Sequence, residues 1–242
     1  MKILFSPSEG KTNLMINEPI NSNSFIFPKL YNKRIYILNN YNNYIHSLSN
    51  EELNKYFAIK NGIDFKINLF KEQTCKAIQR YNGVAYDYLE YNNLNTNSQK
   101  YIDENTLIFS NLFGVIKAND FIPIYRMKQG QNLPNIEIAK YYKQEFSKSL
   151  DDYLQNELVL DLRAEYYNKF YKPKNYITMK FIKNGKVVSH WAKAYRGIVL
   201  KSLAEQNIQT QQDILNLEIP NLSIKEIQTT KNTKTIIYEI RG

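Results

Sequence analysis

Cysteine is almost absent from this chain of 242 residues, since Cys75 is the only one. One cysteine cannot close a disulfide within the chain or supply a cysteine-based zinc site, so both kinds of stabilisation are excluded. No apolar run approaches the roughly 20 residues that a membrane-spanning helix needs, and residues 1–7 turn polar too soon for a signal peptide. The sequence therefore predicts a cytoplasmic protein that does not associate with membranes.

Histidine is nearly as scarce, and the common catalytic signatures are missing. The two histidines, His46 and His190, lie too far apart in the sequence for a familiar metal-ligand spacing. The chain contains no GxGxxG, GxSxG, HExxH or CxxC pattern. The sequence therefore predicts no metal and no cofactor, and we interpret each histidine as a surface or half-buried polar residue.

The segment after the first predicted strand ends in Gly10-Lys11-Thr12, as a phosphate-binding P-loop does. A P-loop also needs a glycine five residues before Gly10, where this chain has Phe5, and a helix directly after the loop. Residues 13–19 have no helical pattern, so the sequence excludes a nucleotide-hydrolysing P-loop. A loop that presents Lys11 to an anion stays open as an interpretation.

Acidic residues are missing from one long stretch, and this absence locates the net charge. The chain has 32 Lys and Arg against 23 Asp and Glu, a formal net charge of +9. Residues 166–204 hold nine basic residues and no acidic one, so the rest of the chain is neutral. Aromatic side chains are interleaved with these cations. Clustered cations attract polyanions and aromatic rings stack on bases, which favours nucleic-acid binding over a merely solvated lysine-rich surface.

Glycine and proline are sparse, with 8 and 7 residues, and no repeat or linker-like segment is visible. The sequence therefore predicts one domain over residues 1–242. Buried apolar runs and alternation predict strands at residues 1–5, 107–109, 158–160 and 235–240. Helical spacing and capping signals predict helices at residues 50–60, 63–70, 74–83, 137–154, 195–206 and 210–217. Strands mixed with helices indicate an α/β class, or mixed α+β, with a mixed central sheet.

A β-hairpin is predicted where an Asn-Gly pair, the strongest short turn signal, separates two apolar stretches. Its strands are expected at residues 177–182 and 187–192. A two-residue turn sets Lys183 opposite Lys186. The hairpin thus concentrates part of the positive charge on one element.

Two carboxylates follow the predicted strand at residues 158–160. Asp161 and Glu165 flank Arg163 at the end of that strand, where polar groups of α/β proteins often face a crevice. A carboxyl group that is desolvated, or close to an arginine, can serve as a general acid or base. The alternative is a helix N-terminus, where acidic side chains offset the helix dipole without any chemistry, and the pattern favours this reading.

Arginine is rarer than lysine, so its positions carry information. Arg126 and Arg196 both follow a tyrosine. A planar guanidinium suits bidentate contact with a phosphate or a carboxylate. A structural ion pair explains either residue equally well.

Six short motifs occur in order along nearly the whole chain. They are Ser6-Pro7 with Lys11-Thr12, residues 81–86, 112–116, 123–127 with Gly130, 160–167 and 192–197. Together they resemble the YaaA family, also called the peroxide-stress protein family. The commoner family form is Ser-Pro-x-Lys-Thr, whereas this chain has three residues between the proline and the lysine. Whether Lys11 points into the family's cleft is therefore open.

The resemblance implies a single-domain α/β fold peculiar to the family and likened to a cantaloupe slice. It also implies a positively charged cleft that binds duplex DNA, and a helix-hairpin-helix element. The candidate for that element is residues 50–60, a turn at Gly62 and the helix at residues 63–70, whose backbone N–H groups would reach a phosphate. In cells the family is tied to limiting damage by hydrogen peroxide, and no settled enzymatic activity is implied.

The leading hypothesis is a DNA-binding protein of the oxidative stress response that contacts double-stranded or distorted DNA largely without sequence specificity. Its expected phosphate contacts are Lys11, Gly62, Arg126, Lys128, Lys169, Lys172, Lys174, Lys193 and Arg196. Tyr166, Tyr171 and Trp191 are expected to stack on exposed bases, and a monomer is favoured. The alternative is an enzyme acting on a nucleotide or a nucleic-acid base, with Glu165 or Asp161 as the acid or base.

Overall fold

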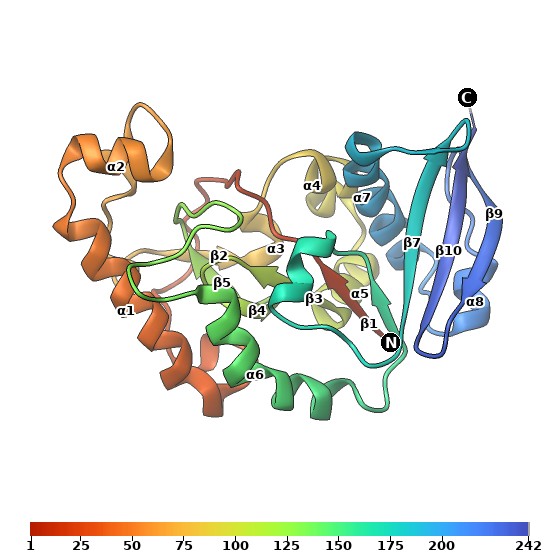
Figure 1. Ribbon diagram of the computed structural model, residues 1–242, viewed down its shortest axis with the longest axis horizontal. Coiled ribbons are helices and arrows are strands. Elements are labelled where there is room, and N and C mark those ends of the chain that lie inside the picture. The colour runs from red at the N-terminus through yellow and green to blue at the C-terminus, as the bar shows by residue number, and fades with distance from the viewer. Residues whose placement is uncertain (242) are drawn as a thin grey trace.

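A mixed sheet of eight strands runs through the molecule (Figure 1). The computed structural model describes residues 1–241, except for the side chains of Ser189 and His190, so the interpretation of His190 lies outside the described residues. The strand order is β4–β3–β1–β6–β7–β10–β9, and β8 pairs with β7. The strands are β1 (Lys2–Phe5), β3 (Thr106–Ser110), β4 (Gly114–Lys117), β6 (Val159–Asp161), β7 (Tyr176–Lys183), β8 (Lys186–Val187), β9 (Leu222–Thr229) and β10 (Thr233–Ile240). A separate pair is formed by β2 (Thr74–Lys76) and β5 (Phe121–Pro123).

Eight α-helices pack around the sheet in the part of the chain that the structure describes. They are α1 (Tyr31–Ser47), α2 (Asn50–Phe57), α3 (Ala77–Arg80), α4 (Val84–Leu89), α5 (Thr96–Asn105), α6 (Ile138–Leu154), α7 (Ser189–Glu205) and α8 (Gln211–Leu215). α4, α5 and α7 pack together, while α1 and α6 lie beside each other away from β9 and β10 (Figure 1). The predicted α/β class with a mixed central sheet is confirmed.

No helix among the described residues is long and apolar enough to span a bilayer. His46 is exposed on α1, with its Nδ1 atom 2.7 Å from the carbonyl oxygen of Asn42, as expected of a surface histidine. Within the same described residues, no group of three or more His, Cys, Asp or Glu side chains comes together in a way that could hold a metal ion.

The centre of the sheet follows directly from the sequence. Ile3, Leu4 and Phe5 are almost fully buried in β1, which pairs in parallel with β3 on one side and with β6 on the other. A strand that is covered on both faces needs a continuous apolar run, and this run is what predicted it. The predicted strands at residues 1–5, 107–109, 158–160 and 235–240 all exist, with boundaries shifted by one or two residues.

The first helix of the expected helix-hairpin-helix is confirmed, but the second is wrong. Ser49 and Glu52 form the capping box that starts α2. The helix ends at Phe57, and the segment expected as a helix at residues 63–70 contains only the 3-10 turn Gly62–Phe65. Gly62 packs against the backbone of α2 at Leu53, so the chain turns back tightly and gains no apolar helical face there.

Two further predictions hold only in part. Thr74, expected to cap a helix over residues 74–83, begins the buried strand β2, because pairing with the distant β5 overrides the local signal, and the helix is confined to α3. The Thr74 hydroxyl donates to the carbonyl oxygen of Glu18. The hairpin turn is confirmed, with Lys183 opposite Lys186. Its second strand, expected at residues 187–192, is only β8, because the chain enters α7 at Ser189.

Several elements had no sequence prediction, and α1 and β9 show why. α1 buries Ile37, Leu38, Tyr41 and Ile45 on one face, but asparagines between them, which are poor helix formers, obscure the pattern. β9 is an edge strand that is exposed along most of its length, so it lacks the alternation that reveals a half-buried strand. Both form because neighbouring elements supply the partner.

Candidate functional site

The connections of the sheet place a crevice at the carboxyl end of β1. The chain leaves β1 and reaches β3 on one side, and later returns to β6 on the other side. The loops that follow β1 and β6 therefore diverge. In α/β proteins a ligand typically binds at such a switch point, outside the carboxyl ends of the strands.

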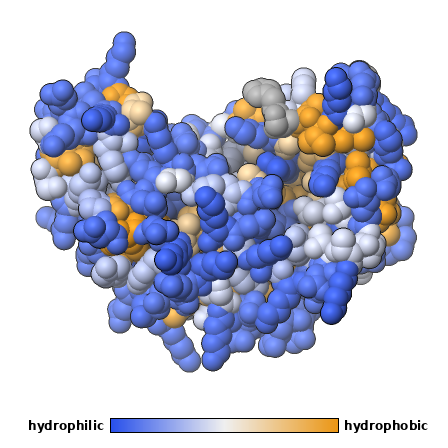
Figure 2. Space-filling view, viewed as in Figure 1, coloured by the Kyte–Doolittle hydropathy of each residue, from blue (hydrophilic) through white to orange (hydrophobic). Residues whose placement is uncertain are grey.

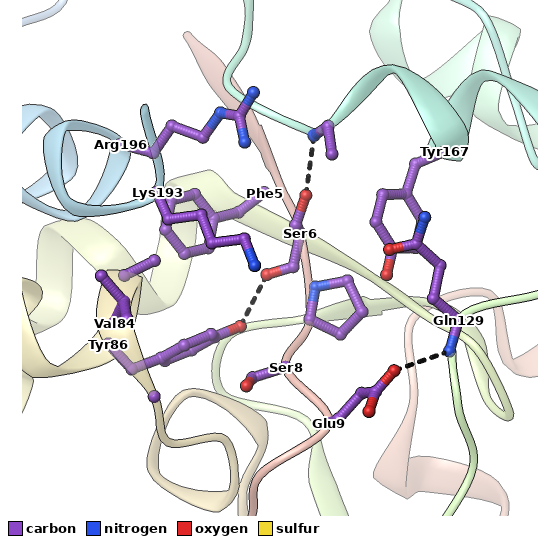
Figure 3. A pocket seen from close by; sticks show the side chains of 14 residues that line it. Phe5, Ser6, Ser8, Glu9, Val84, Tyr86, Gln129, Tyr167, Lys193 and Arg196 are labelled. Carbon is purple, nitrogen blue, oxygen red and sulfur yellow. Dashed lines mark hydrogen bonds between the residues drawn. The ribbon is translucent and has the colours of Figure 1, made fainter. Parts of the chain in front are cut away.

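A cavity of about 290 Å³, called here the switch-point pocket, occupies this position (Figure 3). Its walls come from the loops after β1 and β6, the start of α4, one turn of α7 and the loop that contains Gln129. The lining residues are Phe5, Ser6, Pro7, Ser8, Glu9, Gly83, Val84, Ala85, Tyr86, Gln129, Ala164, Tyr167, Lys193 and Arg196. Segments from five distant parts of the sequence thus build one site.

Ser6 links the segments that form the switch-point pocket by hydrogen bonds. Its hydroxyl oxygen accepts a hydrogen bond from the N–H of Ala164 at 2.8 Å, and its carbonyl oxygen accepts one from the Tyr86 hydroxyl at 2.9 Å. Figure 3 shows both bonds meeting at Ser6. The loop after β1 is therefore held to the loop after β6 and to α4, which fixes the cavity between them.

One wall is basic. Lys193 and Arg196 lie one turn apart on α7, so they share a helix face, and both line the pocket. Gly197 lets this face approach α4, because a methyl group there would collide with the carbonyl oxygen of Ala85. Burial lowers the pKa of Arg196, although the Asp161 carboxylate acts in the opposite direction. Within the described residues, the Arg196 guanidinium makes no hydrogen bond or ion pair.

The opposite wall of the pocket carries a carboxylate and an amide side chain. Glu9 and Gln129 face Lys193 and Arg196 across the pocket in Figure 3. The backbone N–H of Gln129 donates to a carboxylate oxygen of Glu9 at 3.3 Å, which orients that carboxylate. The switch-point pocket is therefore polarised, with two cations at one end and an acceptor at the other.

Lys11 lies outside the lining of the switch-point pocket and folds beneath the loop after β1. Its Nζ atom donates to the carbonyl oxygens of Ser8 and Glu9 at 3.2 and 3.0 Å and lies 4.1 Å from the centre of the Tyr125 ring. Burial, followed by the positive charge of Arg126, lowers the pKa of Lys11 to about 7. These contacts indicate that Lys11 stabilises the conformation of this loop.

Arg126 and Lys128 also lie outside the lining. The Arg126 Nε atom donates weakly to the carbonyl oxygen of Phe57 at 3.4 Å, and its guanidinium lies over the Phe65 ring at 5.8 Å. Arg126 thus ties its loop to α2. The backbone N–H of Lys128 donates to the Gln131 side chain, and its side chain is half-buried.

The two candidate carboxylates have different surroundings, and neither lines the pocket. Asp161 is buried and accepts hydrogen bonds from Nε and a terminal nitrogen of Arg163, at 2.9 and 2.7 Å. Arg163 also donates to the carbonyl oxygens of Tyr167 and Tyr171, which holds the 3-10 turn Glu165–Lys169 in place. Glu165 is exposed at the start of that turn. This geometry gives the acid-base hypothesis no support.

The cations at the end of this turn and just after it are exposed rather than gathered around a cavity. Lys169 lies over the Tyr166 ring at 5.1 Å, and Lys174 pairs with Asp151 at 2.9 Å. Lys172 is exposed. They contribute to the surface field but not to the pocket wall.

The residues expected to stack on bases differ in how exposed their aromatic rings are. Trp191 is 51% exposed on α7, and Tyr166 is half-buried. Tyr171 is buried, stacks on Phe109 and donates its hydroxyl to Asp151 at 2.8 Å, so it offers no free face to a base. The stacking prediction for Tyr171 is wrong because its aromatic ring completes the core.

The packing of the chain explains why a glycine occupies position 62. Its N–H donates to the side-chain oxygen of Asn54 at 2.6 Å, so this group is occupied. A side chain at this position would also meet the backbone of Leu53. The glycine is thus required by its close approach to α2, whatever the module binds.

The surface is hollowed above these elements. Figure 2 shows a notch between the part of the molecule that carries α2 and the part that carries α4 and the start of α7. The loop after β1 lies between these parts (Figure 1). Of the nine expected phosphate contacts, Lys193 and Arg196 alone line the switch-point pocket.

Sequence reasoning about individual residues missed Glu9, Gln129 and Tyr167 as parts of a site. None has a spacing that indicates binding, because they meet only through the sheet connections. Gly83, Tyr86 and Tyr167 do lie in segments that carried the family resemblance. That resemblance was the one signal that could have pointed to them.

Comparison with known proteins gives one consistent assignment. The family model described as Peroxide stress protein YaaA matches residues 1–228. The chain is 50% identical over 244 residues to an uncharacterised protein of Campylobacter jejuni, with 99% of each chain covered. It is 31% identical over 254 residues to a UPF0246 protein of Corynebacterium glutamicum strain R, covering 98% of this chain and 100% of the relative. A UPF0246 protein of Streptomyces coelicolor is 27% identical, with 84% and 82% covered.

Proposed function

Because the chain belongs to the peroxide stress protein YaaA family, we propose that it binds DNA through the notch as part of the response to hydrogen peroxide. Binding is to the phosphate backbone and largely independent of sequence, since most of the cations are lysines. The observation that carries the proposal is the pair Lys193 and Arg196 on the pocket wall, without partners among the described residues.

The pair fits a phosphate contact for a physical reason. The Arg196 guanidinium is half-buried and has no partner among the described residues, so its paired N–H groups are free to bind an anion. Lys193 adds a second charge one helical turn away. These two cations give the backbone of a nucleic acid a fixed point of attachment, while the remaining surface lysines add a long-range attraction.

The hairpin lysines supply that attraction in this proposal. Lys180 and Lys186 are exposed on β7 and β8, and Lys183 is half-buried beside the turn. β7 and β8 lead directly into α7, so their charge lies on the same side of the notch as Lys193. Exposed charges of this kind raise the rate of encounter and are strongly screened by salt.

α2 and the turn Gly62–Phe65 form the other wall in this proposal, although the turn does not continue into the second helix that a helix-hairpin-helix element needs. The Gly62 N–H is already donated to Asn54, so we assign phosphate contact on this wall to the exposed Lys55 and Lys60. The cantaloupe-slice form of the fold and the monomeric state belong to the same proposal.

The test is duplex binding measured by fluorescence anisotropy between 50 and 300 mM salt. The logarithm of the affinity should fall linearly with the logarithm of the salt concentration, with a slope of about −0.9 for each phosphate neutralised. The double variant Lys193→Ala, Arg196→Ala should bind about tenfold more weakly, with a slope less negative by roughly 2.

The matched control is Lys140→Ala, Lys143→Ala, which removes two exposed lysines at the same spacing from α6. α6 lies on the side of the molecule opposite the notch (Figure 1). This control should bind DNA as the parent protein does. Affinity that stays flat with salt, or an equal loss in both double variants, would refute binding through the notch.

A further inference from the structure

The size of the switch-point pocket sets an upper limit on what can enter it. A volume of about 290 Å³ lies at the lower end of pockets that hold small organic ligands. A double helix, whose major groove alone is about 12 Å wide, is too large to enter. Duplex contact at the notch therefore leaves the interior of the pocket unexplained.

The charge of the basic wall indicates which anion fits. Lys193 and Arg196 together carry two positive charges. A phosphate monoester carries nearly two negative charges at neutral pH, whereas a carboxylate or an internal phosphodiester carries one. The guanidinium also presents paired N–H groups that match two phosphate oxygens. The wall is thus matched to a terminal phosphate.

The rest of the lining indicates what the phosphate is attached to. Pro7, Val84 and Tyr167 add apolar and aromatic surfaces to the lining of the cavity. At the far end the Glu9 carboxylate offers hydrogen-bond acceptors, which suit a ligand that presents N–H donors there. A nucleobase has a flat apolar face and donors on its edge, and proteins read such bases by stacking and by edge contacts.

We propose that the switch-point pocket binds a single nucleoside monophosphate, with its phosphate on Lys193 and Arg196 and the donor edge of its base on Glu9. The site goes beyond backbone binding at the notch, because it takes one nucleotide by both ends. It shares two cations with the DNA site but does not rest on duplex binding. Guanine offers two adjacent N–H donors to a carboxylate, so guanosine 5′-monophosphate is the probe.

The experiment is calorimetric titration of the full chain with guanosine 5′-monophosphate, guanosine and inorganic phosphate. The nucleotide should bind at least tenfold more tightly than either part alone, because only it reaches both ends of the pocket. Equal affinity for the nucleotide and inorganic phosphate would overturn the proposal, since the base would then contribute nothing. Absence of nucleotide binding would overturn it as well.

Variants test the two ends separately. Arg196→Lys keeps the charge but loses the paired donors, and should weaken nucleotide binding at least threefold. Glu9→Gln should weaken nucleotide binding about fivefold and leave the affinity for inorganic phosphate unchanged. Lys140→Ala, Lys143→Ala is the control and should bind the nucleotide normally. Thermal unfolding of each variant shows whether it is folded. Unchanged nucleotide affinity in folded Arg196→Lys and Glu9→Gln would refute the assigned orientation.

A 5′-phosphorylated DNA strand ends in the same chemical group, so another arm separates the two sources. Duplexes with 5′-phosphate and 5′-hydroxyl ends are compared, each with and without the free nucleotide. A preference for phosphorylated ends that the nucleotide abolishes assigns the pocket to strand ends, and no preference assigns it to the free nucleotide. Nucleotide binding without duplex binding would sink only the proposed function, whereas duplex binding without nucleotide binding would sink only this inference.

Discussion

Two groups of cations in the basic stretch of the chain differ in their surroundings. Lys193 and Arg196 lie on α7 and line a cavity at the end of β1, where Lys193 is exposed and Arg196 is half-buried. Lys180, Lys183 and Lys186 lie on the β7–β8 hairpin, mostly in contact with solvent. Both groups look alike in the sequence. The difference shows that charge density locates a region, whereas the lining of a cavity locates a site.

The largest effect is expected from a change in the packing of α7 on α4. Gly197→Ala should cost about 3 kcal/mol of unfolding free energy, because the added methyl group meets the backbone of Ala85 and the helices must separate. The same shift should move Lys193 and Arg196 off the pocket and weaken DNA binding. Urea denaturation and anisotropy measure the two effects.

The hairpin has its own glycine as a control. Gly185 adopts φ +76° in the turn and has no atoms near the position of a side chain. Gly185→Ala should therefore cost only about 1 kcal/mol, from the left-handed conformation alone. It should leave DNA affinity intact. Equal losses of stability and affinity for both glycine variants would contradict the distinction between the two regions.

Lys11 extends the comparison to a lysine enclosed beneath a loop. Its pKa is lowered from 10.5 to about 7, mainly by burial, so the unfolded chain binds more protons than the folded one between these values. Its contribution therefore makes the protein more stable as pH rises through this window. Between pH 7 and pH 9 the parent should gain about 2 kcal/mol relative to Lys11→Met, as measured by urea denaturation at each pH.

An exposed lysine provides the reference for that measurement. Lys186→Met on the hairpin should show no such dependence on pH, because Lys186 is solvated in both states. A stability difference between the parent and Lys11→Met that stays constant from pH 7 to pH 9 would show that Lys11 is charged in the folded state throughout.

The smallest effect is expected from the hairpin pair. Lys183→Ala, Lys186→Ala should reduce duplex affinity less than threefold at 150 mM salt, since exposed charges act mainly on the rate of association. The loss should grow at 50 mM salt. Stopped-flow association rates measure this directly. A tenfold loss that persists at high salt would move the principal DNA contact from α7 to the hairpin.

Particular residues show how far the sequence could predict the site. Lys193 and Arg196 were selected from their motif, and both line the pocket. Lys11 and Arg126 were selected in the same way but serve the loop and α2 instead. A motif identifies residues that matter without saying which face each side chain reaches. That depends on how the loop after β1 folds against Tyr125.

The same distinction between local sequence and tertiary contacts applies to the fold. The sequence by itself determined what depends on neighbours in the chain: the buried run of β1, the capping box of α2, the turn of the hairpin and the stretch that carries the charge. The tertiary structure alone decided that Thr74 joins a strand and that Asp161 is neutralised by Arg163. It also placed Glu9 opposite Arg196 across one cavity. The physical reason is that burial, pairing between strands and the meeting of loops at a switch point depend on segments far apart in the chain.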